Sequence, residues 1–170
     1  MEELVFNEIK ERAKDVSRKT GACKEGYHAL LKADSIGRLC LVLKRYWSDV
    51  IGKYRLDTFK ILDDLYTQHK EDFNKYDIFY NESSDKGMCL VSRGEGYEFS
   101  NKAQVWLFGD SCASIMGAKV TAKDKSHVTA YRGANVMLFD ESSAVAMAYC
   151  YIHAFNNNKV EQKTHARVIR

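Results

Sequence analysis

Proline is absent from this sequence of 170 residues. Its absence excludes Pro-rich linkers and is typical of long regular elements. Long apolar runs are also missing, since no stretch approaches the roughly 18 consecutive apolar residues of a membrane-spanning helix. The first residues, MEELVFNEIKERAKD, are acidic and amphipathic, whereas a signal peptide begins basic and continues apolar. We therefore expect a cytoplasmic protein.

Cysteine and histidine are few, and neither forms a recognisable site. The five cysteines are odd in number and lack the spacing of zinc ligands, so they are predicted to be buried thiols without partners: Cys23, Cys40, Cys89, Cys112 and Cys150. The five histidines share no motif spacing, and no nucleophile elbow, zincin motif or phosphate-binding loop is present. The sequence predicts no catalytic residue, no metal site and no cofactor. A pocket in which Cys23 or Cys40 met His28 would instead indicate an enzyme.

Neither sign of charge is in large excess. The net charge is +3, with 17 basic and 18 acidic residues up to position 99 and nine basic and five acidic residues after it. This small surplus is usually a solvated surface, and it is a weak signal for nucleic acid. The candidate nucleic-acid contacts are Lys119, Lys123, Lys125 and Arg132.

A repeat of eight residues is present in the second half of the chain. One pattern of small and aliphatic residues recurs in a single register, apart from one slip of one residue, at Val105, Val120, Val128, Val136, Ala144, Ile152, Val160 and Val168. A small residue stands two positions before each of them, and Ser111 and Ala113 form the same pair in the shortened unit. Nine units run from Lys102 to Arg170. Short units that recur at a fixed period predict a solenoid, because each unit buries its apolar side only against its neighbours.

Within each unit the second, fourth and sixth positions are small or aliphatic, which is the alternation of a β-strand. Turn residues separate the strands, among them Gly109, Asp124, Asp140 and the pair Asn156-Asn157. Odd and even units end differently, which favours two units per coil. The sequence therefore predicts a narrow two-sheet coil in which residues of equal parity stack inward as one ladder: Val105, Val120, Val136, Ile152 and Val168.

The first half of the chain has helical spacing. Four helices are predicted, over 2–19 with Gly21 as the cap, 23–33, 34–47 with Asp34 or Ser35 as the N-cap, and 56–73. The segment GMCLVS, 87–92, is predicted to be a first strand. The expected fold is thus α+β, with a helical capping domain over 1–80, a connecting segment over 81–101 and a β-solenoid over 102–170.

A resemblance agrees with this organisation. The stretch GACKEGYHALLKA, the lead-in KGMCLVS and units such as SHVTAYRGANV resemble uncharacterised octapeptide-repeat proteins of gut bacterial and phage or mobile-element genomes. The resemblance spans nearly the whole chain, although Met137-Leu138-Phe139 and Gln162-Lys163-Thr164 depart from the pattern. It implies an architecture and carries no known activity.

The seventh position of the units is expected to face outward in two rows. Phe108, Phe139 and Phe155 are predicted to stack on one sheet, with Lys123 between them, and Met116, Tyr131 and Met147 on the other. Exposed apolar rows usually contact another molecule. Two alternatives are that the helices cover one row and that this position turns inward at the corner.

Function is predicted from this surface alone. We expect a non-enzymatic binding module that presents the solenoid to a protein partner or to its own copy. The alternative is an inhibitor, from a phage or mobile element, of a host defence nuclease or signalling enzyme, with contact to nucleic acid. Gln162 and Arg170 replace the aliphatic residues expected near the end of the core, and Lys159, Glu161, Lys163 and Arg167 discourage stacking of coils end to end. Any homodimer is therefore expected to form through the phenylalanine row.

Overall fold

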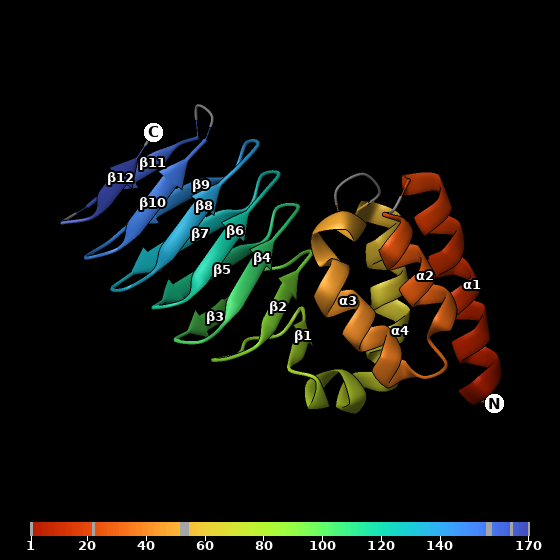
Figure 1. Cartoon of the computed structure of the whole chain (residues 1–170). Coiled ribbons are helices and arrows are strands. Elements are labelled where there is room, and N and C mark those ends of the chain that lie inside the picture. The colour runs from red at the N-terminus through yellow and green to blue at the C-terminus, as the bar shows by residue number, and fades with distance from the viewer. Residues whose placement is uncertain (1, 22, 52–54, 156–157, 164, 170) are drawn as a thin grey trace. The chain divides into compact units, whose positions relative to one another are not determined.

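The computed structural model describes residues 2–21, 23–51, 55–155, 158–163 and 165–169 (Figure 1). The chain divides into two compact units, one over Met1–Ile78 and one over Phe79–Arg170. The first is built of helices and the second of strands, so the predicted α+β class is confirmed. None of the helices in the described ranges is long and apolar enough to cross a membrane.

Four helices form the first unit, as the sequence predicts: α1 (Glu2–Thr20), α2 (Lys24–Lys32), α3 (Ile36–Ile51) and α4 (Arg55–Lys75). Gly21 follows α1 with φ of 60°, which is the left-handed conformation common just after a helix. The Cys23 sulfur accepts a hydrogen bond from Gly26 N at the start of α2, and Ser35 Oγ accepts one from Arg38 N at the start of α3. Of the two predicted caps for α3, Ser35 is therefore the one that bonds the helix.

Neighbouring helices of this unit run in opposite directions. Lys10 in the middle of α1 donates to Ala33 O just after α2, and Lys44 near the middle of α3 donates to the carbonyl of Tyr76, just after α4. The backbone of Gly37 at the start of α3 also lies against the Tyr76 ring. The apolar faces meet in a core with buried side chains from every helix, among them Ile9, Leu30, Leu39, Leu62 and Phe73.

The second unit is a β-solenoid of about five turns with two strands in each turn. One sheet has seven strands in the order β1-β2-β4-β6-β8-β10-β12, and the other has five in the order β11-β9-β7-β5-β3; we call them sheet A and sheet B. The strands are β1 (Ile78–Tyr80), β2 (Met88–Val91), β3 (Tyr97–Ser100), β4 (Gln104–Leu107), β5 (Cys112–Met116), β6 (Lys119–Ala122), β7 (His127–Tyr131), β8 (Asn135–Leu138), β9 (Ser143–Ala146), β10 (Tyr151–Ala154), β11 (Val160–Gln162) and β12 (Arg167–Ile169). Figure 1 shows the successive coils from green to blue.

The inward ladder of sheet A has the predicted register. Val105 pairs with Val120, Val120 with Val136, Val136 with Ile152, and Ile152 with Val168, all between parallel strands. Ala113, Val128, Ala144 and Val160 form the corresponding ladder of sheet B. Units of equal parity therefore lie one coil apart, as the sequence predicts.

Hydroxyl and amide groups occupy one inner corner of the coil. Ser126 Oγ donates to Lys123 O at 2.7 Å, and Ser142 Oγ donates to Phe139 O at 2.6 Å. Asn158 continues the series one coil later, where its amide donates to Asp140 O and Ser142 O, both at 3.0 Å. These side chains are buried, and the carbonyl groups that they bond lie in the corner, outside the sheets. The side chains therefore provide the hydrogen bonds that water would otherwise supply.

The same corner of the coil turns through residues with positive φ. Gly109, Asp124 and Asp140 have φ of 62°, 57° and 55°, each one coil after the last. Asp124 Oδ2 accepts a hydrogen bond from Gly109 N at 3.0 Å, and Asp140 Oδ2 accepts one from Asp124 N at 3.2 Å. Each aspartate thus adopts the left-handed conformation that the turn needs, and its carboxylate accepts a hydrogen bond from a backbone N–H of the coil before it. The predicted turn Asn156-Asn157 lies outside the described residues.

The solenoid begins earlier in the chain than the predicted boundary at Lys102. The segment 81–101 is already part of the coils, because β2 pairs with β4 and β3 pairs with β5. Cys89 pairs with Val105 and Tyr97 with Ala113, so the register of the repeat continues upstream. The first strand predicted over 87–92 is β2, whereas β3 was missed because a tyrosine stands where later units have valine or alanine.

The last coil has a less apolar interior than the others, as the sequence indicates, although Val160 and Val168 still pack against the core. Gln162 is exposed and donates from Nε2 to Ala166 O at 2.8 Å. The predicted edge charges Lys159, Glu161, Lys163 and Arg167 are all exposed. Arg170 lies outside the described residues.

The ladder of sheet A yields a test of the register. Val136 is fully buried at the centre of that ladder, whereas Asn135, the preceding residue of β8, points outward. Val136→Asp places a carboxylate without a counter-charge in the core and is expected to lower the free energy of unfolding by about 3–5 kcal/mol. Asn135→Asp, on the same strand, is expected to change it by less than about 0.5 kcal/mol. Urea unfolding followed by far-UV circular dichroism measures both. Equal stability of the two variants would show that the register is wrong.

Candidate binding sites

Two of the three phenylalanines in the predicted row, Phe139 and Phe155, stack on one another. The Phe139 and Phe155 rings are 4.6 Å apart and inclined by 3°, and Lys123 Nζ lies 5.5 Å from the centre of the Phe139 ring. The row Lys123, Phe139, Phe155 therefore runs up the outside of sheet A, one residue per coil. Phe155 is 57% exposed and Phe139 is half-buried, so solvent reaches mainly the upper end of the stack.

Phe108 does not belong to an exposed row, and that part of the prediction is wrong. Its side chain is 1% exposed. Met88 and Leu90 are also buried, although the alternation of β2 directs them away from the ladder that contains Cys89. On sheet A the outward side chains of β2 are therefore buried, whereas several outward side chains of β8, β10 and β12 are exposed. The repeat pattern gives the direction of a side chain, but it does not give what lies on top of it.

The second predicted row lies on sheet B and is uneven. Met116 is 57% exposed, whereas Tyr131 and Met147 are half-buried. Met116 and Tyr131 pair across β5 and β7. They line a groove of mixed polar and apolar character that also contains Asp85, Glu98 and Ser114. This row is thus a mixed surface, less apolar than the stack on sheet A.

Three further exposed apolar residues enlarge the surface of sheet A, and the sequence analysis missed them. Met137, Tyr151 and Ile169 are 39%, 49% and 39% exposed and lie at the third and fifth positions of their units. His153 pairs with Met137 on one side and with Ile169 on the other. We call the outward surface of Met137, Phe139, Tyr151, Phe155 and Ile169 the aromatic face. The sequence contains a signal for this surface, because a polar residue of an earlier coil is replaced by an apolar one. Met137 and Ile169 stand in the row of Thr121, and Tyr151 stands in the row of Lys119.

The charge of this side of sheet A has one sign. From β4 to β12, the outward positions that the structure describes hold three basic residues and no aspartate or glutamate: Lys119, Lys123 and Arg167. Arg167 pairs directly with Tyr151. The outward strand positions around the aromatic face are therefore basic, whereas the exposed Asp140 and Glu141 lie at the corner directly after Phe139. The basic positions favour an acidic partner surface.

The four predicted nucleic-acid contacts do not gather in one patch. Lys119 and Lys123 lie at the two ends of β6 on sheet A. Lys125 lies in the corner after β6, and Arg132 lies in the corner after β7, on the other side of the coil. Only Lys119 and Lys123 are thus on the same side as the aromatic face.

One corner beside the aromatic face carries an unusual tyrosine. Gly117, Gly133 and Tyr149 occupy equivalent corners in successive coils, with φ of 74°, 80° and 51°. A side chain in this left-handed conformation costs roughly 1 kcal/mol, which glycine avoids. The Tyr149 side chain is nevertheless 62% exposed, and its ring stacks on His165 at 5.5 Å. A strained and exposed aromatic residue is a candidate for binding rather than for folding.

The thiols show no arrangement for nucleophilic catalysis. Cys112 pairs with His127 across β5 and β7, and His127 Nδ1 lies 2.9 Å from Ser143 Oγ. Burial, together with the carboxylates of Glu95 and Asp110, raises the pKa of Cys112, so its thiol stays protonated. Burial also raises the pKa of Cys40 to about 12. Among the described residues no three histidine, cysteine, aspartate or glutamate side chains are grouped as metal ligands.

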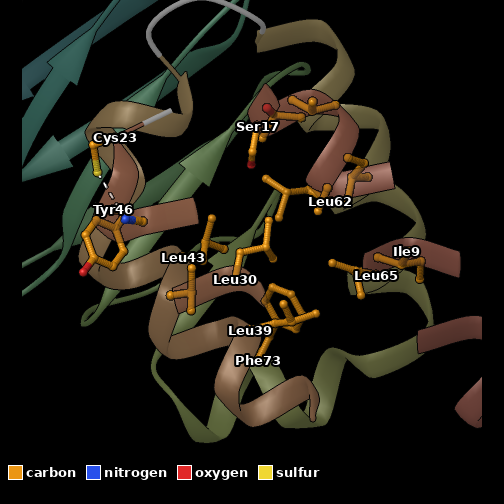
Figure 2. Close-up of a pocket in the computed structure, with 16 residues that line it drawn as sticks. Ile9, Ser17, Cys23, Leu30, Leu39, Leu43, Tyr46, Leu62, Leu65 and Phe73 are labelled. Carbon is orange, nitrogen blue, oxygen red and sulfur yellow. Dashed lines mark hydrogen bonds between the residues drawn. The ribbon is translucent and has the colours of Figure 1, made fainter. Parts of the chain in front are cut away.

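The helical unit contains an apolar cavity of about 100 Å³ (Figure 2). All four helices contribute to its walls, with Ile9, Leu30, Leu39, Leu62 and Phe73 among the lining residues. Cys23 and Tyr46 line it as well, but neither Cys40 nor His28 does, so the cysteine–histidine pocket that would indicate an enzyme is not formed there. An unfilled cavity costs roughly 24 cal/mol per Å³, or about 2 kcal/mol for this one.

Comparison of the chain with models of protein families, with curated proteins and with solved structures found no match. No family is therefore identified. The architecture implied by the resemblance to octapeptide-repeat proteins, a helical region followed by a β-solenoid, is confirmed by the structure. Membership of that group stays a prediction.

The strained corner gives a prediction about Tyr149. Tyr149→Gly removes the left-handed strain together with the stacking on His165, so the melting temperature is expected to stay equal or to rise. Tyr151→Gly, two residues later in β10, is expected to lower the free energy of unfolding by about 1 kcal/mol, because glycine weakens a strand. Thermal unfolding by circular dichroism compares them. A fall of more than about 1 kcal/mol for Tyr149→Gly would mean that its ring is structural.

Proposed function

We propose that the protein is a non-enzymatic binding module that contacts a protein partner through the aromatic face. The observation that carries this proposal is the gathering of exposed apolar side chains. Of the eight large hydrophobic side chains that are exposed in the described residues, Met137, Tyr151, Phe155 and Ile169 belong to this face, and Tyr149 lies at the adjacent corner. Exposed apolar surface bordered by charge is the usual composition of a protein interface, with aromatic residues as its anchors.

The chemistry of the face supports an acidic protein as the partner. A complementary surface has apolar side chains opposite Tyr151 and Phe155 and carboxylates opposite Lys119, Lys123 and Arg167. A second copy of the chain fits less well, because two-fold pairing of this face brings the same basic residues toward one another. Of the two partners that the sequence left open, a foreign acidic protein is thus favoured over a second copy of the chain.

Contact with nucleic acid is the second candidate, as part of an inhibitor of a nuclease or signalling enzyme. It is favoured by the position of Lys119 and Lys123 beside aromatic side chains, which is the composition of single-strand binding surfaces. It is disfavoured by the stacking of Phe139 on Phe155, because each ring already covers a face of the other that a base would need.

Two matched substitutions test the proposal. Phe155 and Met116 are both 57% exposed, but they lie on opposite sheets. The tagged wild type, Phe155→Glu and Met116→Glu are each used to capture proteins from the native host, and the affinity of the captured protein is then measured with purified components. Phe155→Glu is expected to weaken binding at least about tenfold, and Met116→Glu less than about twofold. Equal loss in both variants, or loss only in Met116→Glu, would contradict the proposal.

Two measurements on the same proteins distinguish a second copy of the chain and a nucleic acid from a protein partner. Sedimentation of the wild type at tens of micromolar is expected to show a monomer, and a dimer that Phe155→Glu dissociates would assign the face to a second copy. Retention of single-stranded DNA or RNA that falls steeply with salt, and that Phe155→Glu abolishes, would assign it to nucleic acid.

A further inference from the structure

The cavity of the helical unit is elongated and has two chemically different ends. On α1 its lining extends from Ile9 to Ser17, which is about 12 Å at the rise of an α-helix. Phe73 and Leu39 lie at one end, and Ser17 and Cys23 lie at the other (Figure 2). Because neighbouring helices run in opposite directions, the end of α1, the start of α2 and the start of α4 meet at this second end. Every lining residue with a polar side-chain group belongs to it: Ser17, Cys23, Tyr46 and Thr58.

The polar end is also where the cavity approaches the surface. Cys23 is exposed and Tyr46 is half-buried, whereas Phe73 at the opposite end is 1% exposed and Leu39 is 8% exposed. A side chain on Gly26 would lie 3.2 Å from both the Cys23 sulfur and the Tyr46 ring, so the glycine leaves only just enough room for these two groups at the opening. The space between is lined by leucine, isoleucine, valine and alanine side chains.

We propose that this cavity binds the alkyl chain of a small amphiphile. The chain lies between the helices with its end toward Leu39 and Phe73, and the polar head group stays in water near Ser17, Cys23 and Tyr46. Protein interiors are normally filled, and an apolar cavity of this kind stays dry and takes up apolar molecules of matching shape. The length, the apolar walls and the single polar end together fit a flexible chain with one head group better than a compact polar ligand.

Chain length is the first test. Hexanoate, octanoate, decanoate and dodecanoate are titrated into the full-length protein by isothermal titration calorimetry, with the matching 1-alkanols as a second series. Each methylene that enters the cavity is expected to raise the affinity roughly fourfold, and the gain is expected to stop once the cavity is full. Both series are expected to give the same limit, since the chain rather than the head group is buried. No binding at millimolar concentration, or affinity that rises without a limit, would overturn the proposal.

A substitution that fills the cavity is the second test. Ala13 lines it, whereas Ala29 on α2 lies in a separate surface groove and serves as the control. Ala13→Leu is expected to keep or raise the melting temperature and to weaken decanoate binding at least tenfold, and Ala29→Leu is expected to leave binding unchanged. Binding that is equally strong in Ala13→Leu and in the wild type would place the ligand elsewhere.

Cys23 reports occupancy in the unmodified protein. Its thiol is exposed at the opening, and Cys40 and Cys89 are fully buried. Alkylation of Cys23 by a small maleimide, located by mass spectrometry, is expected to slow several-fold in saturating decanoate. An unchanged rate, together with measurable decanoate binding, would show that the chain does not enter at this end.

Discussion

The narrow space between the two sheets of the solenoid is the constraint on which this unit depends. Each coil has only two strands, so the inward side chains of one sheet meet those of the other with nothing between them. Valine, alanine, isoleucine and serine fill that space, and Val120, Val128, Ala130 and Val136 are all at most 1% exposed. Among the described residues an aromatic ring lies inside only in the first coil, as Phe99, whereas later coils hold aliphatic side chains no larger than Leu138 and Ile152.

The same constraint fixes the corners. A coil this narrow must reverse direction within a few residues, and it does so through left-handed residues that recur once per coil. Aspartates at one corner accept hydrogen bonds from the backbone of the coil before, and buried serines and Asn158 bond the inward carbonyls. Since the interior and the corners admit few residue types, variation in the sequence falls on the outward positions. The aromatic face is therefore the main difference between this solenoid and one whose outward positions are all polar.

The sequence predicted the repeat well because the repeat is a local property of the chain. Alternation within each unit and the difference between odd and even units were enough to place Val105, Val120 and Val136 in one ladder, and the structure confirms this register. The start of the solenoid was missed because Tyr97 takes a position that is aliphatic or small in later coils. A pattern search that relies on residue type fails where the interior is wide enough for an aromatic ring.

Burial by other segments could not be predicted in the same way. Phe108 has the same place in its unit as Phe155, yet one is buried and the other is exposed. The period of the repeat assigns both residues to the same position and so contains no information about this difference. The apolar cavity was likewise beyond the sequence, because it depends on the spacing of four helices and not on any motif. Met137 and Tyr151 were within reach, since both interrupt outward rows that are polar in the coil before.

The central claim is that the ladder between the sheets holds the solenoid and that the aromatic face serves binding. The most direct test is the combined variant Met137→Thr, Tyr151→Thr and Phe155→Thr, which keeps strand-forming residues and removes the exposed apolar groups. Its free energy of unfolding is expected to lie within about 1 kcal/mol of the wild type, because only surface positions change, while capture of the protein partner is lost. A loss of several kcal/mol, or a variant that keeps its partner, would contradict the account.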